Sequence, residues 1–180
     1  LHDGVAEAIK YGCIRDKELF DSLYHYRNDD ELLDHMDYII STCCRIKKDV
    51  VEKDEKDKGE RMVLNFGHTL GHAIEKYFNY QKYTHGEAVA IGMYWITVNS
   101  ERLGLSKPGT SESIKSLLEK YDLPYEIDIS DPAAIFENVI LDKKNLRGHL
   151  NLIVLEEIGK AQIYKSSPEF IKKILFYSNK

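Results

Sequence analysis

Cysteine is scarce in this sequence. The 180 residues contain three cysteines, Cys13, Cys43 and Cys44, an odd number without C-x-x-C spacing. Disulfide scaffolds and structural zinc knuckles both require several regularly spaced cysteines. The cysteine content therefore argues against both classes and favours a reducing, cytoplasmic setting.

Long hydrophobic runs and an excess of basic residues are also missing. The longest mostly apolar run, Ala88–Val98, is too short and too interrupted to cross a bilayer. The chain has 25 basic and 30 acidic residues, a net charge of −5, and its lysines and arginines are spread along the sequence. Because nucleic-acid surfaces are basic and clustered, we expect neither a membrane nor a nucleic acid as partner.

The sequence further lacks a signal peptide and a glycine-rich strand–turn–helix of the kind that holds a dinucleotide. It starts at Leu1 rather than at a methionine, so we expect a fragment of a longer protein. With 180 residues, 43% of them hydrophobic, the chain is large enough for one good core. We therefore expect a single domain over residues 1–180.

What the sequence does contain is helical periodicity. The predicted helices cover residues 4–12, 17–26, 28–51, 61–75, 88–103, 113–121, 131–140 and 169–177. Thr84 and Glu87 form a capping box ahead of the apolar helix, and Gly104 is expected to end that helix. Two alternating segments, residues 149–155 and 160–165, predict a β-hairpin. The predicted fold class is mainly α, a bundle-like helical domain with a small β-hairpin near the C-terminus.

The segment 61–75 is predicted to be the central helix of a site. Four of its polar residues recur at i, i+4, i+7 and i+11 and share one helical face: Arg61, Asn65, His68 and His72. Surface helices more often carry mixed lysine and glutamate on the polar face. Gly67 and Gly71 each cost a helix about 1 kcal/mol relative to alanine, which indicates that another element packs close to the backbone here.

Histidines in and after this segment predict a metal site. His68 and His72 are spaced to reach one metal ion from the same helical face, and His85 precedes the apolar helix. A carboxylate would complete a set of three protein ligands with an open coordination position. Spacing alone does not choose among the three candidate carboxylates, Glu7, Glu75 and Glu87. Arg61 and Asn65 indicate an anionic, hydroxylated ligand beside the metal.

Four segments resemble the 3-dehydroquinate synthase family. They are G-V-A-E-A-I-K-Y-G at residues 4–12, the segment 47–61, L-N-F-G-H-T-L-G-H-A-I-E at residues 64–75, and H-G-E-A-V-A-I-G-M at residues 85–93. Their order and spacing hold across most of the chain and continue through Asp142-Lys143-Lys144 and the predicted hairpin. The two histidine-containing blocks are highly specific to this family.

The resemblance implies a mostly helical C-terminal domain of a two-domain enzyme. The N-terminal half of such an enzyme is a Rossmann-like domain that binds NAD, which agrees with the absence of a dinucleotide loop in this chain. The implied reaction converts 3-deoxy-D-arabino-heptulosonate 7-phosphate, a phosphorylated sugar acid, into 3-dehydroquinate and phosphate in the shikimate pathway. The implied partners are this substrate, the chain's own NAD domain and a second copy in a homodimer. Without the NAD domain, we expect the chain to be inactive.

The resemblance also implies roles for individual residues. The ligands of Zn²⁺, or of another divalent ion such as Co²⁺, would be Glu7, His68 and His85. Substrate would be bound by Lys10, Lys47, Arg61, Asn65 and His72, and the pocket would be closed by Lys143 or Lys144. Among these, the residues implied in catalysis are Lys10, Asn65 and His72.

Two positions depart from the family pattern, and three alternative functions stay open. Asp57 replaces a more usual glutamate, and Glu60 replaces an apolar residue before Arg61; neither is an implied metal ligand. The alternatives are a sugar-phosphate cyclase that makes an inosose or valiolone product, a related iron-dependent alcohol or glycerol dehydrogenase, and a non-catalytic helical metal-binding or interaction module. The paired G-H-T and G-H-A segments favour dehydroquinate synthase over the first alternative.

Overall fold

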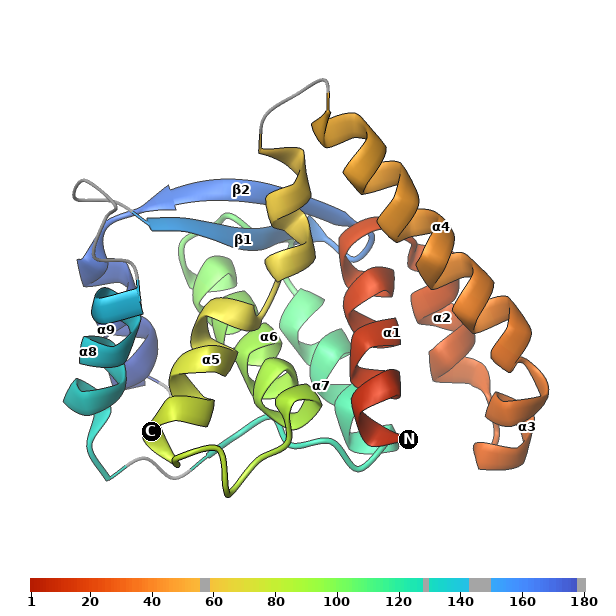
Figure 1. Ribbon diagram of the computed structural model, residues 1–180, viewed down its shortest axis with the longest axis horizontal. Coiled ribbons are helices and arrows are strands. Elements are labelled where there is room, and N and C mark those ends of the chain that lie inside the picture. Colours follow the sequence, from red (N-terminus) through yellow and green to blue (C-terminus); the bar gives the residue numbers. More distant parts are fainter. Residues whose placement is uncertain (56–58, 128–129, 143–149, 178–180) are drawn as a thin grey trace.

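Helices make up most of the fold, with one two-stranded sheet (Figure 1). The computed structural model describes residues 1–55, 59–127, 130–142 and 150–177. The elements in chain order are α1 (His2–Arg15), α2 (Lys17–His25), α3 (Asp29–Asp34), α4 (Met36–Asp54), the 3₁₀ helix η1 (Glu60–Asn65), α5 (His68–Tyr77), α6 (His85–Arg102), α7 (Thr110–Lys120), α8 (Pro132–Asp142), β1 (Leu150–Glu157), β2 (Lys160–Ser166) and α9 (Pro168–Tyr177). This architecture confirms the predicted fold class.

Helix α6 lies at the centre of the bundle. It contacts α1, α5, α7 and β1, and it is apolar nearly all round, so most of its side chains are buried. The predicted capping box starts this helix: Glu87 N–H donates to Thr84 Oγ1, and Thr84 N–H donates to Glu87 Oε1, each at 3.2 Å. Gly104 follows its last turn with a φ of +73°. The predicted start and end of α6 are therefore confirmed to within a few residues.

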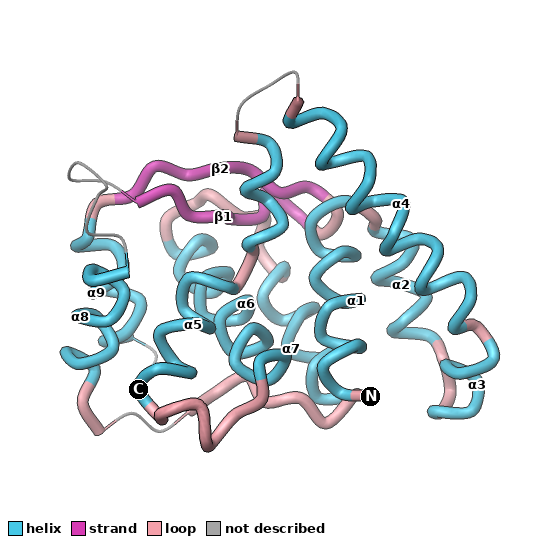
Figure 2. The backbone as a smooth tube through the Cα atoms, in the orientation of Figure 1, coloured by secondary structure: helices cyan, strands magenta, loops and turns pink. Residues whose placement is uncertain are grey.

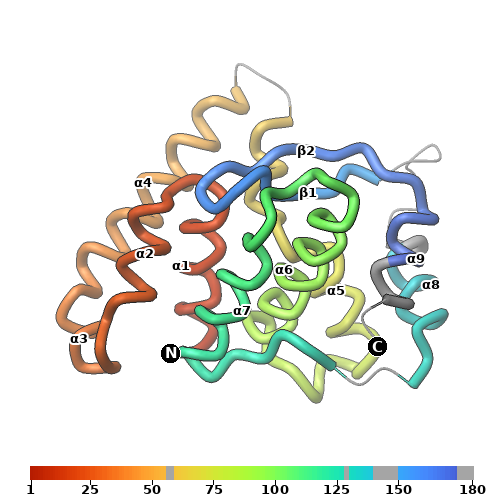
Figure 3. Tube along the Cα trace, turned by 180° about the vertical axis from the view of Figure 1, so that it is seen from behind, coloured from red at the N-terminus to blue at the C-terminus, as the bar shows by residue number. Residues whose placement is uncertain are grey.

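The remaining elements surround α6 on several sides. Figure 1 shows α2, α3 and α4 beyond α1, and α8 with α9 at the opposite side of the bundle. Viewed from behind, α7 lies beside α6 (Figure 3). The antiparallel hairpin crosses one end of the bundle (magenta in Figure 2) and contacts α1, α6 and η1. None of the described helices combines the length and hydrophobicity needed to cross a membrane.

The predicted continuous helix over residues 61–75 is wrong. The structure has η1 up to Asn65, a turn at Phe66 and Gly67, and α5 from His68. Gly67 has a φ of +76°, a left-handed conformation that glycine adopts without steric cost. A Cβ at this position would lie 2.8 Å from the carbonyl oxygen of Val89. The close approach inferred from the glycines is confirmed, and it is α6 that approaches.

The predicted long helix over residues 28–51 is also divided. Helix α3 ends at Asp34 and α4 begins at Met36; between them, His35 has a φ of −103° and a ψ of +13°, which are not helical. The His35 ring stacks on Tyr26, with ring centroids 4.9 Å apart, and its backbone N–H donates to Leu32. These contacts explain the bend, which the apolar periodicity of the segment does not reveal.

Candidate metal and substrate site

Helix α1 contributes a carboxylate and an ammonium group one turn apart. Lys10 Nζ donates to Glu7 Oε2 at 2.8 Å. The Lys10 side chain is 5% exposed, whereas the Glu7 side chain is 36% exposed. A buried lysine requires a paired anion, and Glu7 supplies it. This pairing fixes the Glu7 carboxylate with Oε1 left to face α5.

The turn at Gly67 directs the first residue of α5 toward α1. His68 Nδ1 lies 3.0 Å from the carbonyl oxygen of Phe66, to which an Nδ1–H donates. Its Nε2 then carries the lone pair and lies 3.8 Å from Glu7 Oε1. Burial is the main cause that lowers the pKa of His68 below its ordinary value of 6.5. The imidazole is therefore neutral near pH 7, the form that binds a metal.

His85 is positioned by contacts between α1 and the start of α6. Asp3 Oδ1 accepts hydrogen bonds from Thr84 Oγ1 at 2.6 Å and from the Gly86 N–H at 3.0 Å. A Cβ on Gly86 would lie 2.6 Å from the Asp3 Cα, so only glycine permits this approach. As a result, the N-terminal end of α6 is held beside α1, and His85 lies near Glu7 in space.

Two groups of possible metal ligands result among the described residues. In each group, one donor atom per residue lies within 4.8 Å of the others: Glu7, His68 and His85 form the first group, and His72, Glu75 and His85 form the second. The ring centroids of His68, His72 and His85 are 5.2 to 5.9 Å apart. A carboxylate with two imidazoles is a donor set that suits Zn²⁺ with an open position. Glu87, the third candidate carboxylate, belongs to neither group because it caps α6.

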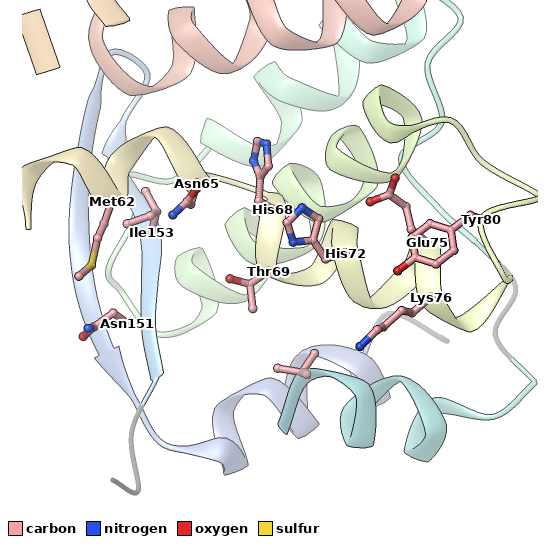
Figure 4. A pocket seen from close by; sticks show the side chains of 11 residues that line it. Met62, Asn65, His68, Thr69, His72, Glu75, Lys76, Tyr80, Asn151 and Ile153 are labelled. Atoms are coloured by element: carbon pink, nitrogen blue, oxygen red, sulfur yellow. The ribbon is translucent and has the colours of Figure 1, made fainter. Parts of the chain in front are cut away.

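A cavity of about 700 Å³ opens beside these groups (Figure 4). Its lining residues are Met62, Asn65, His68, Thr69, His72, Glu75, Lys76, Tyr80, Val139, Asn151 and Ile153. Of the residues implied in substrate binding, Asn65 and His72 line the cavity, whereas Lys10 is not among the described lining residues and pairs with Glu7. The structure therefore brings together the carboxylate, the histidines and the asparagine despite the break in the predicted helix.

Four further predicted cationic residues are not placed in this lining. Lys47 and Arg61 are exposed and are not among the described residues that line the cavity. Lys143 and Lys144 lie outside the described residues. The roles of these four residues stay predictions.

Sequence reasoning missed Thr69, Tyr80 and Asn151. Asn151 reaches the cavity from β1, and its Oδ1 is buried without a hydrogen-bond partner among the described residues. The alternation of side chains in the predicted hairpin indicates on which face of the sheet Asn151 lies, but it does not show that this face borders a cavity. Thr69 follows His68 at the start of α5, so its contact with the cavity depends on the unpredicted turn.

The chain matches a known family and known proteins. Residues 4–145 match the family described as 3-dehydroquinate synthase C-terminal. The chain is 56% identical over 165 residues to the 3-dehydroquinate synthase of Clostridium acetobutylicum, covering 92% of this chain and 46% of that protein. It is 42% identical over 175 residues to that of Enterococcus faecalis, covering 97% of this chain and 49% of that protein. The chain thus spans about half the length of these curated relatives.

Two solved structures have a similar fold. A 2-deoxy-scyllo-inosose synthase complexed with carbaglucose-6-phosphate, NAD⁺ and Co²⁺ aligns with a TM-score of 0.81 at 25% identity, covering 98% of this chain and 52% of that one. The 2-epi-5-epi-valiolone synthase of Streptomyces hygroscopicus with NAD⁺ and Zn²⁺ bound aligns with a TM-score of 0.78 at 20% identity, covering 98% of this chain and 50% of that one. The second likeness concerns the fold alone. From the family match and the sequence identities, the chain belongs to the 3-dehydroquinate synthase C-terminal family.

Proposed function

We propose that this chain is the metal- and substrate-binding domain of a 3-dehydroquinate synthase. The whole enzyme would convert 3-deoxy-D-arabino-heptulosonate 7-phosphate into 3-dehydroquinate and phosphate, as a phosphorus–oxygen lyase of the cytoplasm. The observation that carries the proposal is the group Glu7, His68 and His85 beside a cavity of about 700 Å³. The identity of 56% to a curated relative supports the same reaction.

The donor set suits a catalytic divalent metal. Glu7, His68 and His85 would hold Zn²⁺ or Co²⁺, which when bound lowers the pKa of a coordinated substrate hydroxyl and so favours its oxidation. NAD would be held by a domain that this chain does not include, and it would accept and return a hydride. The neutral state of His68 and the fixed direction of its Nε2 make it ready to bind the metal without losing a proton.

Several side chains of this chain would bind and orient the substrate. Lys10 holds the Glu7 carboxylate in place from the protein side. His72 is exposed on α5, with its ring centroid 5.7 Å from that of His68, where an imidazole can donate to a phosphate or move a proton. Asn65 offers an amide to substrate hydroxyls from the end of η1. Much of the catalysis would then be positioning of the substrate.

Charge for the substrate's phosphate and carboxylate would come from lysine and arginine side chains. Lys47, Arg61 and one lysine of the pair Lys143 and Lys144 fulfil this role in the proposal, because a substrate with both a phosphate and a carboxylate requires cations near these groups. The proposal also assigns the whole enzyme a homodimeric state. Both assignments follow from the family rather than from the contacts of this chain.

A second candidate function is another sugar-phosphate cyclase. It is favoured by the TM-score of 0.81 to a 2-deoxy-scyllo-inosose synthase that binds a carba-analogue of glucose 6-phosphate. The curated relatives at 42 to 56% identity favour dehydroquinate synthase instead. Substrate choice separates these two functions directly.

The test joins this chain to the N-terminal half of the Clostridium acetobutylicum enzyme, which is 56% identical in the shared half. The fusion, supplied with NAD and Zn²⁺, should release phosphate from 3-deoxy-D-arabino-heptulosonate 7-phosphate and not from glucose 6-phosphate. The unfused chain and a fusion carrying His68→Ala should release none. Turnover of glucose 6-phosphate alone would refute the proposed substrate in favour of the second candidate.

A further inference from the structure

His85 is shared by the two groups of possible metal ligands, and Glu75 is the carboxylate of the second group. Glu75 Oε2 lies 3.3 Å from His85 Nδ1. The Glu75 side chain is 12% exposed, whereas the His85 side chain is 45% exposed. The exposed ring thus has a largely buried carboxylate on one of its two nitrogens.

The position of Glu75 follows from the geometry of α5. Glu75 lies seven residues after His68, which is two helical turns, and three residues after His72, so all three side chains lie on neighbouring parts of one face. Figure 4 shows His68, His72 and Glu75 projecting from this helix along the cavity. Helix α6 packs against α5, and His85 at its first turn contacts Glu75.

From this geometry we propose that Glu75 is a positioning residue for His85 and not itself a metal ligand. The inference rests on the proposed metal site at Glu7, His68 and His85. A carboxylate on Nδ1 accepts the Nδ1–H, so the lone pair of His85 lies on Nε2. The same contact orients the ring.

The first ligand group contains two histidines, and each has a different partner on Nδ1. His68 donates from Nδ1 to the carbonyl oxygen of Phe66 and has its Nε2 toward Glu7. His85 has the Glu75 carboxylate in the corresponding place. The need for a partner is greater at His85, because its side chain is 45% exposed and that of His68 is 15% exposed, so less packing restrains the ring.

The alternative is that Glu75 binds the metal directly together with His72 and His85. The two roles make different demands on the side chain. A positioning residue needs an acceptor oxygen, which glutamine retains, whereas a ligand needs the negative carboxylate that glutamine lacks. The pair Glu75→Gln and Glu75→Ala therefore separates the two roles.

The experiment titrates Co²⁺ into the metal-free chain and follows the visible ligand-field spectrum, with Zn²⁺ competition to give affinities. The wild type is compared with the variants Glu75→Gln, Glu75→Ala and Glu7→Gln. The matched control is Glu52→Gln, because Glu52 is an exposed carboxylate on α4 that belongs to neither ligand group. Thermal melts of the metal-free variants verify that each one folds.

We expect Glu75→Ala to weaken metal binding about 10- to 100-fold, the usual effect of losing a carboxylate that supports a histidine ligand. Glu75→Gln should stay close to the wild-type affinity, with the wild-type spectrum, and Glu7→Gln should lose binding more severely than Glu75→Ala. An unchanged affinity in Glu75→Ala would overturn the inference, and so would a Glu75→Gln variant as weak as Glu75→Ala.

The proposed metal site fails in a distinguishable way. Wild-type affinity in Glu7→Gln, or a wild-type chain that binds no Co²⁺, would refute the site at Glu7, His68 and His85 together with any role of Glu75 toward it. Loss of binding in Glu7→Gln beside normal binding in Glu75→Ala would leave the metal site intact and refute only the positioning role.

Discussion

Replacing Gly92 with alanine tests the direct backbone contact between α5 and α6, the helices that carry the three histidines. A Cβ on Gly92 would overlap the carbonyl oxygen of Gly67 and lie 3.1 Å from both the Gly67 carbonyl carbon and the Gly71 nitrogen. All three are backbone atoms, so no side-chain rotation relieves the overlap. Helix α5, which carries His68 and His72, must therefore move away from α6.

The size of the effect follows from two opposing contributions. Overpacking of this kind costs about 3 kcal/mol, the upper part of its usual range, because only backbone shifts relieve it. Alanine in place of glycine in a helix raises the unfolding free energy by about 1 kcal/mol. The net loss in unfolding free energy is about 2 kcal/mol, which in a domain of this size lowers the melting temperature by about 4–8 °C.

The assay is thermal unfolding of the metal-free chain followed by circular dichroism. Gly4→Ala is the matched control, since Gly4 also lies in a helix and a Cβ there would meet no atom of the described residues within 4 Å. Gly4→Ala should be neutral or raise the melting temperature by up to about 2–4 °C, as the gain in helix propensity alone predicts. A Gly92→Ala protein that melts at or above the wild-type temperature would refute the close packing of these helices.

Three further predictions concern the site. First, burial is the main cause that lowers the pKa of His68, so the contribution of this residue to stability is complete above pH 6.5 and is lost as the pH falls through the lower folded pKa. Urea unfolding of the metal-free wild type should therefore show a loss of stability on acidification, and the loss should be smaller in His68→Asn. Equal pH dependence of the two proteins would contradict this prediction. Second, Asp3→Ala removes the acceptor for Thr84 and Gly86 and should lower the melting temperature by about 2–4 °C, for a loss of about 1 kcal/mol, and weaken Zn²⁺ binding; unchanged Zn²⁺ affinity would show that this tie does not position His85. Third, His72→Ala should leave Zn²⁺ affinity within about threefold, a change smaller than 1 kcal/mol, and abolish most phosphate release by the fusion enzyme; lost Zn²⁺ binding would place His72 on the metal.

Local sequence patterns were sufficient for most of the secondary structure. The capping box at Thr84 and Glu87 and the hairpin around Gly159 depend on neighbours within a few residues, so they could be identified without knowledge of the fold. The two helix breaks, at Gly67 and at His35, could not be identified in this way. The turn at Gly67 exists because α6 passes close to it, and periodicity within the segment 61–75 contains no information about α6.

The site was predictable in part. Histidine spacing on α5 indicated a metal, but Glu7 and His85 come close only because Asp3 joins α1 to the start of α6, a contact between residues more than 80 positions apart. Spacing therefore left Glu7, Glu75 and Glu87 as equal candidates. The structure separates them by their contacts: Glu7 pairs with Lys10, Glu75 contacts His85, and Glu87 caps a helix. Asn151 carried no chemical pattern in the sequence at all.

The most direct test of the proposed site is a calorimetric titration of Zn²⁺ into the metal-free chain beside the double variant His68→Ala, His85→Ala. Both side chains are at least partly exposed, so the variant should fold, which circular dichroism verifies. The account predicts one-to-one binding by the wild type and its loss in the double variant. Equal binding by the two proteins would remove His68 and His85 as ligands and contradict the account.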